Sequence, residues 1–177
     1  MSHSRVFCIV TNIREKEKVE NALAVDAIDV VESIRGCDYA DDRLEEGYAF
    51  VQEDVDWLAD WVGIDGQVGM EDAPLIKPEE IEIDGERHFY WAVPVDKLKK
   101  TIEKEIKKRI ERIKKELEKP APSLIDIAYE AYLGKGFYFY FPEWGFLNAI
   151  DLYEYVLNLP KYKYENFYVV KTIDYHF

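Results

Sequence analysis

The clearest pattern along the chain is an apolar stripe with helical spacing in residues 96–119. Its positions recur every three or four residues, which places them on one face of a helix and not on a strand. Asp96 is the expected N-cap, and Pro120 cannot continue the helix. We therefore predict one long helix over residues 96–119. The stripe consists of Leu98, Ile102, Ile106, Ile110, Ile113 and Leu117.

Shorter apolar runs predict strands on either side of this helix. Residues 5–13 form an almost continuous apolar and β-branched run, as in a central strand. Residues 137–141 and 166–177 are further strand candidates. In the last of these, period-two alternation places six residues on one face and leaves the other face half polar. The six are Phe167, Val169, Lys171, Ile173, Tyr175 and Phe177.

Residues 80–93 have the pattern of a β-hairpin. Asp84 and Gly85 separate two alternating runs, and this dipeptide favours a two-residue type I′ turn. Such a turn fixes the register of the two strands. It would pair Ile83 with Glu86 and Glu82 with Arg87.

Three shorter helical segments are predicted. Residues 15–35 have roughly helical apolar spacing and a stop at Gly36, and they form either one helix or two helices with a break near Asp26. Residues 123–133 and 143–158 are the other two. Together with the strands before and after it, the last helix suits a βαβ crossover.

These elements predict an α+β fold. We expect a mixed sheet of about five or six strands, with helices mainly on one face and the long helix as the principal cover. A chain of 177 residues that is 48% hydrophobic can bury one core, so we expect a single domain over residues 1–177. A division into sub-lobes 1–79 and 80–177 is the alternative.

Composition indicates the cellular compartment in which we expect the protein. The chain has no apolar run of the length that a membrane span requires, and we expect no membrane association. Its N-terminus turns strand-like too early for a secretory signal. Two cysteines are too few for a disulfide framework, so we expect a cytoplasmic protein with reduced thiols.

Acidic residues dominate residues 38–72, which hold twelve Asp or Glu and one base, Arg43. A short strand is expected over residues 48–52 and a short helix over residues 54–62. The acids could steer a basic partner while interleaved aromatic side chains anchor it. A solvated segment with its tryptophans packed inward is the simpler interpretation. The candidate partner-binding residues are Asp38, Asp41, Asp42, Glu45, Glu46, Asp54, Asp56, Trp57, Asp60 and Trp61.

The predicted long helix is basic, with eleven Lys or Arg and six Asp or Glu, in a chain of net charge −13. A basic helix face attracts nucleic-acid phosphates, although the acidic chain as a whole repels them. A solvated face is the simpler interpretation, and a further hypothesis is that this charge offsets the repulsion within residues 38–72. The candidate nucleic-acid-binding residues are Lys99, Lys100, Lys107, Lys108, Lys114 and Lys115.

Motifs for chemistry are weak. Cys8 lies in an apolar run, where a thiol packs as a small hydrophobe, and the acid beside Cys37 disfavours a thiolate. The histidines and cysteines have no zinc-ligand spacing, and the glycines form no phosphate-binding loop. We therefore expect no metal and no cofactor, and the sequence shows no family signature.

From the sequence we expect a non-enzymatic intracellular binding protein, of the inhibitor, antitoxin or nucleic-acid-mimic type, whose acidic, aromatic-bearing face engages a basic protein. The first alternative is a nucleic-acid-associated protein that acts through the basic face of the long helix. The second is an enzyme whose site is assembled from distant carboxylates and His88. The oligomeric state does not follow from the sequence.

Overall fold

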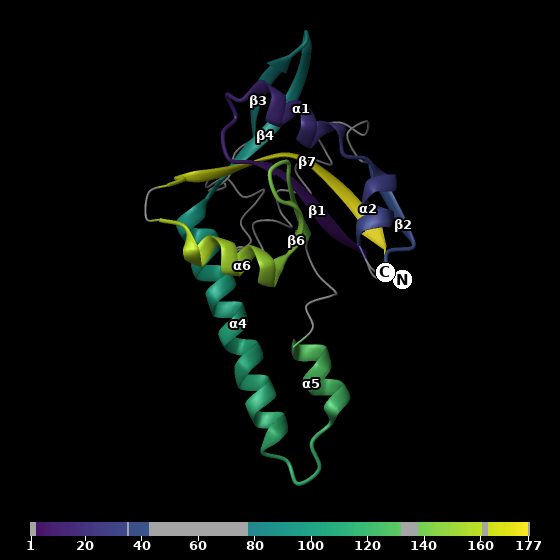
Figure 1. Ribbon diagram of the computed structural model, residues 1–177, viewed down its shortest axis with the longest axis vertical. Coiled ribbons are helices and arrows are strands. Elements are labelled where there is room, and N and C mark those ends of the chain that lie inside the picture. The colour runs from purple at the N-terminus through teal and green to yellow at the C-terminus, as the bar shows by residue number, and fades with distance from the viewer. Residues whose placement is uncertain (1–2, 35, 43–77, 132–137, 161–162, 177) are drawn as a thin grey trace, which may run out of the picture.

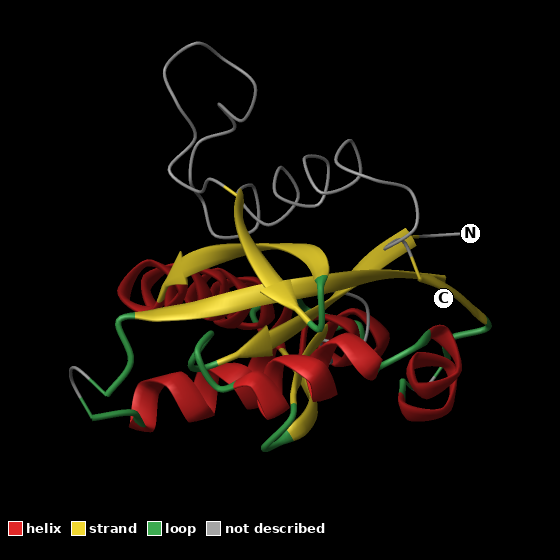
Figure 2. Cartoon of the chain, turned by 90° about the horizontal axis from the view of Figure 1, so that it is seen from above, coloured by secondary structure: helices red, strands yellow, loops and turns green. Residues whose placement is uncertain are grey.

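A computed structural model of the chain describes residues 3–34, 36–42, 78–131, 138–160 and 163–176 (Figure 1). Its strands form one twisted sheet with helices packed against it (Figure 2). The predicted α+β class with a mixed sheet is therefore confirmed. The predicted strand over residues 48–52 and helix over residues 54–62 lie outside the described residues.

Seven strands make up the sheet, in the order β3-β4-β7-β1-β5-β6, with β2 also paired to β7. β1 runs parallel to β5 and antiparallel to β7, and every other pairing is antiparallel. The strands are β1 (His3–Val10), β2 (Tyr39–Asp42), β3 (Pro78–Ile83), β4 (Glu86–Pro94), β5 (Tyr138–Phe141), β6 (Gly145–Asn148) and β7 (Asn166–His176).

Helices cover both faces of the sheet, and the expectation of helices mainly on one face was wrong in this respect. Alternation along β1 shows the division: Val6 and Cys8 pack in the core beneath α1 and α2, while Phe7 and Ile9 pack in the core beneath α4 and α6. An apolar run without polar positions fits such a doubly covered strand. The helices are α1 (Lys16–Ala24), α2 (Ala27–Ser33), α4 (Val95–Leu117), α5 (Leu124–Ala131) and α6 (Ala149–Asn158).

One expectation for β7 was wrong: because the strand contains a β-bulge, the residues expected on one face lie on both faces. The register changes from Cys8 opposite Lys171 to Ile9 opposite Val169, which leaves one extra residue in β7. An extra residue reverses the inward and outward alternation beyond it. Phe167 and Val169 therefore face the α4–α6 core, whereas Ile173 and Tyr175 face the α1–α2 core.

The same bulge directs Lys171 towards the end of α1. This side chain is buried, and its ammonium group donates hydrogen bonds to the backbone carbonyls of Leu23 (3.0 Å) and Val25 (2.5 Å). Carbonyl groups at a helix C-terminus have no partners inside the helix. Lys171, on a strand inside the sheet, thus donates the hydrogen bonds that these carbonyls cannot obtain within α1.

The predicted hairpin is confirmed in both turn and register. Asp84 and Gly85 have φ values of 53° and 86°, as a type I′ turn requires, and Ile83 lies opposite Glu86. Glu82 and Arg87 are also opposite each other. Arg87, however, forms an ion pair with its diagonal neighbour Glu80, at 3.2 Å.

Of the two arrangements expected for residues 15–35, the structure has the one with two helices, and the break between them near Asp26 has a local cause. The Asp26 carboxylate accepts hydrogen bonds from the amides of Ile28 and Asp29, and the Asp29 carboxylate accepts one from the amide of Asp26. This reciprocal capping box starts α2 as a separate helix. Gly36 follows α2 with a φ of 85°, a conformation that glycine adopts without strain.

The long helix α4 begins one residue earlier than predicted, and Pro94, not Asp96, is its N-cap. Pro94 ends β4 in an extended conformation, so the helix starts directly after it and Asp96 falls in the first turn. Burial along the apolar stripe then declines. Leu98 is 1% exposed, but Ile110 is 45% exposed and Leu117 58%. Only the first half of α4 therefore covers the sheet.

The predicted helix over residues 143–158 is shorter than expected. Residues 145–148 form β6, which turns back on β5 after Gly145 (φ 75°), and α6 begins only at Ala149. From the pairings, β5 and β7 are antiparallel, so the predicted crossover from strand 137–141 was wrong. The parallel crossover instead runs from β6 through α6 to β7.

Candidate acidic binding surface

Three of the acidic candidate residues lie on β2 or directly before it. Asp38 and Asp41 are exposed, and β2 pairs antiparallel with the end of β7. Asp42 belongs to β2, but its side chain is not described. The remaining candidates lie outside the described residues: Glu45, Glu46, Asp54, Asp56, Trp57, Asp60 and Trp61.

Helix α2 adds further acidic residues beside β2. The candidates predicted from the sequence did not include them. The helix packs against β2, and Asp29 and Glu32 are exposed on it, with Asp26 at its N-cap. Residues 26–42 of the sequence hold six Asp or Glu and one base, Arg35. The three-residue spacing of Asp26, Asp29 and Glu32 was the available signal, but the interleaved apolar residues made the helix look like core alone.

Large apolar side chains are exposed among these acids. Ile28 is 67% exposed, Tyr39 53% and Val31 38%. Ile28 and Val31 are three residues apart and lie on the same side of α2, while Val30 is buried in the core. We call this surface the acidic edge, and Figure 1 shows its two elements, α2 and β2, beside each other and away from α4. Its members are Asp26, Ile28, Asp29, Val31, Glu32, Asp38, Tyr39 and Asp41.

Next to the acidic edge, one further acid, Asp174, is paired with a base inside the sheet. Asp41 lies opposite Asp174 of β7, and Asp174 lies opposite Arg5 of β1. The Arg5 guanidinium forms an ion pair with Asp174 at 2.5 Å, with their side chains 3% and 16% exposed. The charge of Asp174 is therefore matched inside the molecule, whereas Asp41 presents its charge at the surface.

Tyr39 and Cys37 are held by their neighbours. The Tyr39 ring contacts the His176 ring edge-on, with centroids 5.1 Å apart. The Cys37 thiol donates to the Tyr39 carbonyl at 3.4 Å. Burial raises the pKa of Cys37, and the neighbouring Asp38 raises it further. The thiol is thus protonated at neutral pH and is a poor nucleophile.

The basic candidate residues on α4 do not all lie on the same side of the helix. Lys100, Lys108, Lys114 and Lys115 are exposed, whereas Lys107 pairs with Glu103 at 2.7 Å. Lys99 is partly buried and lines a cavity of about 380 Å³ between α4 and the end of α6.

The solvent face opposite the apolar stripe is lined by five lysines, of which Lys100, Lys108 and Lys115 were among the candidates. We call this set the lysine row; its members are separated by three, four, four and seven residues, and all are exposed. Within the described part of the chain, none of them has an ion pair. The row consists of Lys97, Lys100, Lys104, Lys108 and Lys115.

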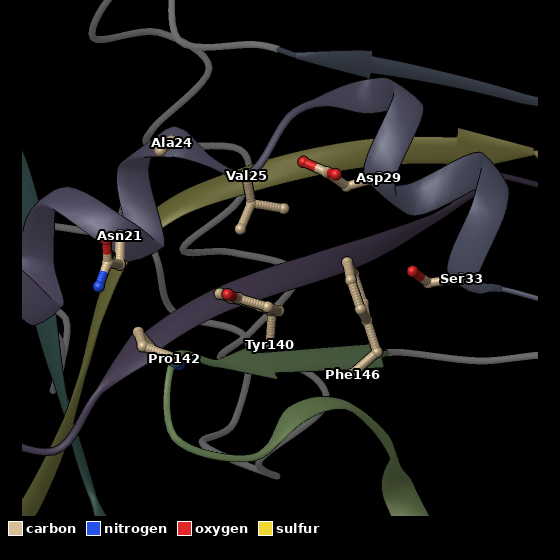
Figure 3. A pocket seen from close by; sticks show the side chains of 8 residues that line it. All are labelled: Asn21, Ala24, Val25, Asp29, Ser33, Tyr140, Pro142 and Phe146. Atoms are coloured by element: carbon tan, nitrogen blue, oxygen red, sulfur yellow. The ribbon is translucent and has the colours of Figure 1, made fainter.

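A cavity of about 320 Å³ lies between the α1–α2 corner and the β5–β6 hairpin. Figure 3 shows Asp29 and Ser33 of α2 on one wall and Tyr140 and Phe146 of the hairpin on the other. Burial raises the pKa of Tyr140, and the nearby Cys8 and Asp29 raise it further. Its hydroxyl is therefore a neutral donor at physiological pH. The remaining lining residues are Asn21, Ala24, Val25 and Pro142.

His88, the histidine considered for an assembled active site, lies on β4 outside both cavities. Its acidic neighbour is Glu86, 3.9 Å away and 82% exposed. No group of three His, Cys, Asp or Glu side chains within the described residues could hold a metal ion.

None of the helices in the described segments combines the length and the apolar character that a membrane span needs. Comparison of the chain with protein-family models, with curated proteins and with solved structures gave no match.

Proposed function

We propose that this chain is a non-enzymatic binding protein whose acidic edge engages a basic protein partner. One observation carries the proposal: Ile28 and Tyr39 are more than half exposed, in a stretch (residues 26–42) of six acids and one base. A solvated acidic surface has no need of exposed apolar anchors. A recognition surface uses both, because carboxylates steer the partner and apolar side chains hold it.

The framework of the acidic edge favours such a role. The capping box fixes the start of α2, and β2 is paired with β7 along its whole length. Little conformational entropy is then lost on binding, which favours affinity. The acids of residues 43–72 follow β2 directly in the sequence and would add to the same negative field.

The test is capture of partners from a cell lysate at low and high salt, followed by identification of the retained proteins. The edge variant Glu32→Gln/Asp38→Asn/Asp41→Asn removes three charges and keeps the apolar anchors. Its matched control, Glu17→Gln/Glu111→Gln/Glu118→Gln, removes three exposed acids from α1 and α4 and the turn after α4. We expect the wild type and the control to retain the same basic protein and the edge variant to lose it. Equal retention by both variants would refute the proposal.

The apolar anchors are tested separately. Ile28→Ser should weaken binding of the captured partner at both salt concentrations, because the anchor contributes without charge. The charge variant should lose affinity mainly at low salt, since salt screens exposed charges. If Ile28→Ser bound the partner with unchanged affinity, the acidic edge would act through non-specific charge attraction alone.

A second candidate function is nucleic-acid binding through the lysine row. The observation that favours it is the alignment of five exposed lysines on one face of α4, free of ion pairs in the described structure. Neighbouring members are about 4.5 to 6 Å apart along the helix, apart from a longer gap before Lys115. Such a row could contact several successive phosphates of one strand.

Fluorescence anisotropy with labelled RNA and DNA oligonucleotides at low salt tests this second candidate. Lys100→Gln/Lys104→Gln/Lys108→Gln should abolish binding, whereas Lys99→Gln/Lys107→Gln/Lys114→Gln, with the same charge change elsewhere around α4, should retain most of it. Each phosphate contact contributes about 0.7 to 0.9 to the logarithmic salt slope. Equal loss in both variants would indicate a response to net charge alone.

A further inference from the structure

The second half of α4 and helix α5 form a helical hairpin that projects from the sheet. Figure 1 shows both helices extending away from the strands, with α5 alongside α4. Arg112 of α4 pairs with Glu130 of α5 at 3.2 Å, and the Glu116 carboxylate accepts a hydrogen bond from the Ser123 amide at 2.9 Å. These contacts join the two helices to each other and not to the sheet.

This hairpin exposes apolar side chains on both of its helices. On α4, Ile110 is 45% exposed and Leu117 58%. On α5, Leu124 is 77% exposed and Ile125 81%, the two highest values among the exposed large hydrophobic residues of the described chain. Two helices alone cannot enclose an apolar core, so part of each stripe remains in water.

We propose that the hairpin, residues 107–131, is a self-association surface through which two copies of this chain pack as a four-helix bundle. Two helical hairpins related by a two-fold axis are a closed arrangement, in which the same patch of each copy meets the other. The exposed stripes of both copies would then form the shared core. This inference is independent of the acidic edge and of the function proposed for it.

The exposed area fits a dimer. A stable interface buries roughly 800 Å² per partner, and homodimer interfaces are about two-thirds apolar, which requires on the order of 500 Å² of apolar surface per copy. Four large aliphatic side chains, exposed between 45% and 81%, supply an area of that order.

Charge also favours a second copy as the occupant. Residues 107–117 of α4 hold six Lys or Arg and two Glu, while α5 holds two acids, Asp126 and Glu130, and no base. The hairpin is therefore complementary to itself, because α4 of one copy can face α5 of the other. The Arg112–Glu130 pair uses this same complementarity within one copy.

A lipid surface fits the hairpin less well. Interfacial segments place Trp, Tyr or Phe at the boundary, whereas the four exposed residues are Leu and Ile. Ile110 also lies about two helical turns from Leu117, so the exposed stripe runs along the hairpin and is not confined to its tip.

Sedimentation velocity and light scattering of the full chain, over a wide concentration range, test the proposal. We expect a mass of twice 20.9 kDa for the wild type at high concentration. Leu124→Glu/Ile125→Glu should weaken the dimer roughly a hundredfold or more and give a monomer with an unchanged circular-dichroism spectrum. The matched control Ile28→Glu/Val31→Glu charges two exposed residues of the acidic edge and should remain dimeric.

A second measurement covers the case in which the charged variant does not fold. Leu117→Cys, combined with Cys37→Ser, should form a disulfide between copies on mild oxidation, because Cys8 is buried and leaves one accessible thiol. A wild type that is monomeric at every concentration would overturn the proposal. So would equal dimerisation of both charged variants, absence of the cross-link, or a monomer that sediments with anionic vesicles.

Discussion

Arg5 of β1 and Asp174 of β7 form an ion pair at 2.5 Å within a cross-strand row that ends at Asp41 on the sheet edge. Asp174→Asn would remove the carboxylate that pairs with the buried Arg5 guanidinium, and we expect a loss of about 3 to 5 kcal/mol in the free energy of unfolding. Urea denaturation measures this loss. Asp41→Asn is the control: it removes an exposed charge from the same row and should change stability by less than about 0.5 kcal/mol.

Lys171 provides a second buried cation with a structural role. Lys171→Met keeps the aliphatic chain but leaves the carbonyls of Leu23 and Val25 without their donor, and we expect a loss of about 2 to 4 kcal/mol. Amide hydrogen exchange should also show faster opening of the C-terminal turn of α1. Lys104→Met, an exposed change on α4, should alter neither quantity; similar effects of both would contradict this assignment.

Stability should depend on position along α4. Leu98→Ala removes a side chain that is 1% exposed and should cost about 2 to 5 kcal/mol. Leu117→Ala removes one that is 58% exposed, and below the concentration of self-association it should cost less than about 1 kcal/mol. Urea denaturation at low protein concentration compares the two. Equal losses would mean that the end of α4 is packed as firmly as its start.

The β3–β4 turn offers a test of backbone conformation. Gly85→Ala places a side chain at a φ of 86° and should cost about 1 to 2 kcal/mol. Asp84→Asn keeps a residue type that tolerates the left-handed region and removes only an exposed ion pair with Lys16. This second change should cost less than about 1 kcal/mol. Thermal denaturation distinguishes the two variants, and a larger loss for Asp84→Asn would be the contrary result.

Stability should fall in strong alkali because of two tyrosines. The hydrogen bond to Glu79, reinforced by burial, raises the pKa of Tyr90 to about 12, and burial beside Tyr164 raises that of Tyr155 to about 12. Both folded pKa values exceed the ordinary tyrosine pKa of 10.0, so the unfolded chain loses its protons first. Their contribution is complete below pH 10 and is lost as the pH rises towards 12.

Tyr90→Phe and Tyr155→Phe test this pH dependence. Each should flatten the decline in the free energy of unfolding between pH 10 and 12. Tyr39→Phe is the control, since Tyr39 is 53% exposed, and the decline should stay as in the wild type. An unchanged slope in both test variants would assign the alkaline loss to other groups.

The elements with local causes were predictable from the sequence. Asp84 and Gly85 specify a turn whatever surrounds it, and the reciprocal hydrogen bonds of Asp26 and Asp29 divide the first helical segment where the sequence allowed a break. The candidate site was predictable in part. Asp38 and Asp41 are exposed, but nothing in the sequence marked Ile28 and Val31 as exposed, because their exposure depends on how α2 rotates against the sheet.

The sequence by itself determined the helical repeat of α4, the hairpin register and the α+β class, because each follows from interactions between residues close in the chain. Only the tertiary structure decided the strand order, the bulge that turns Phe167 and Ile173 to opposite faces, and where the sheet stops covering α4. These features depend on packing between segments far apart in the sequence. The energy of such contacts is absent from any local pattern, which is why Leu98 and Leu117 look alike in the stripe yet differ in the fold.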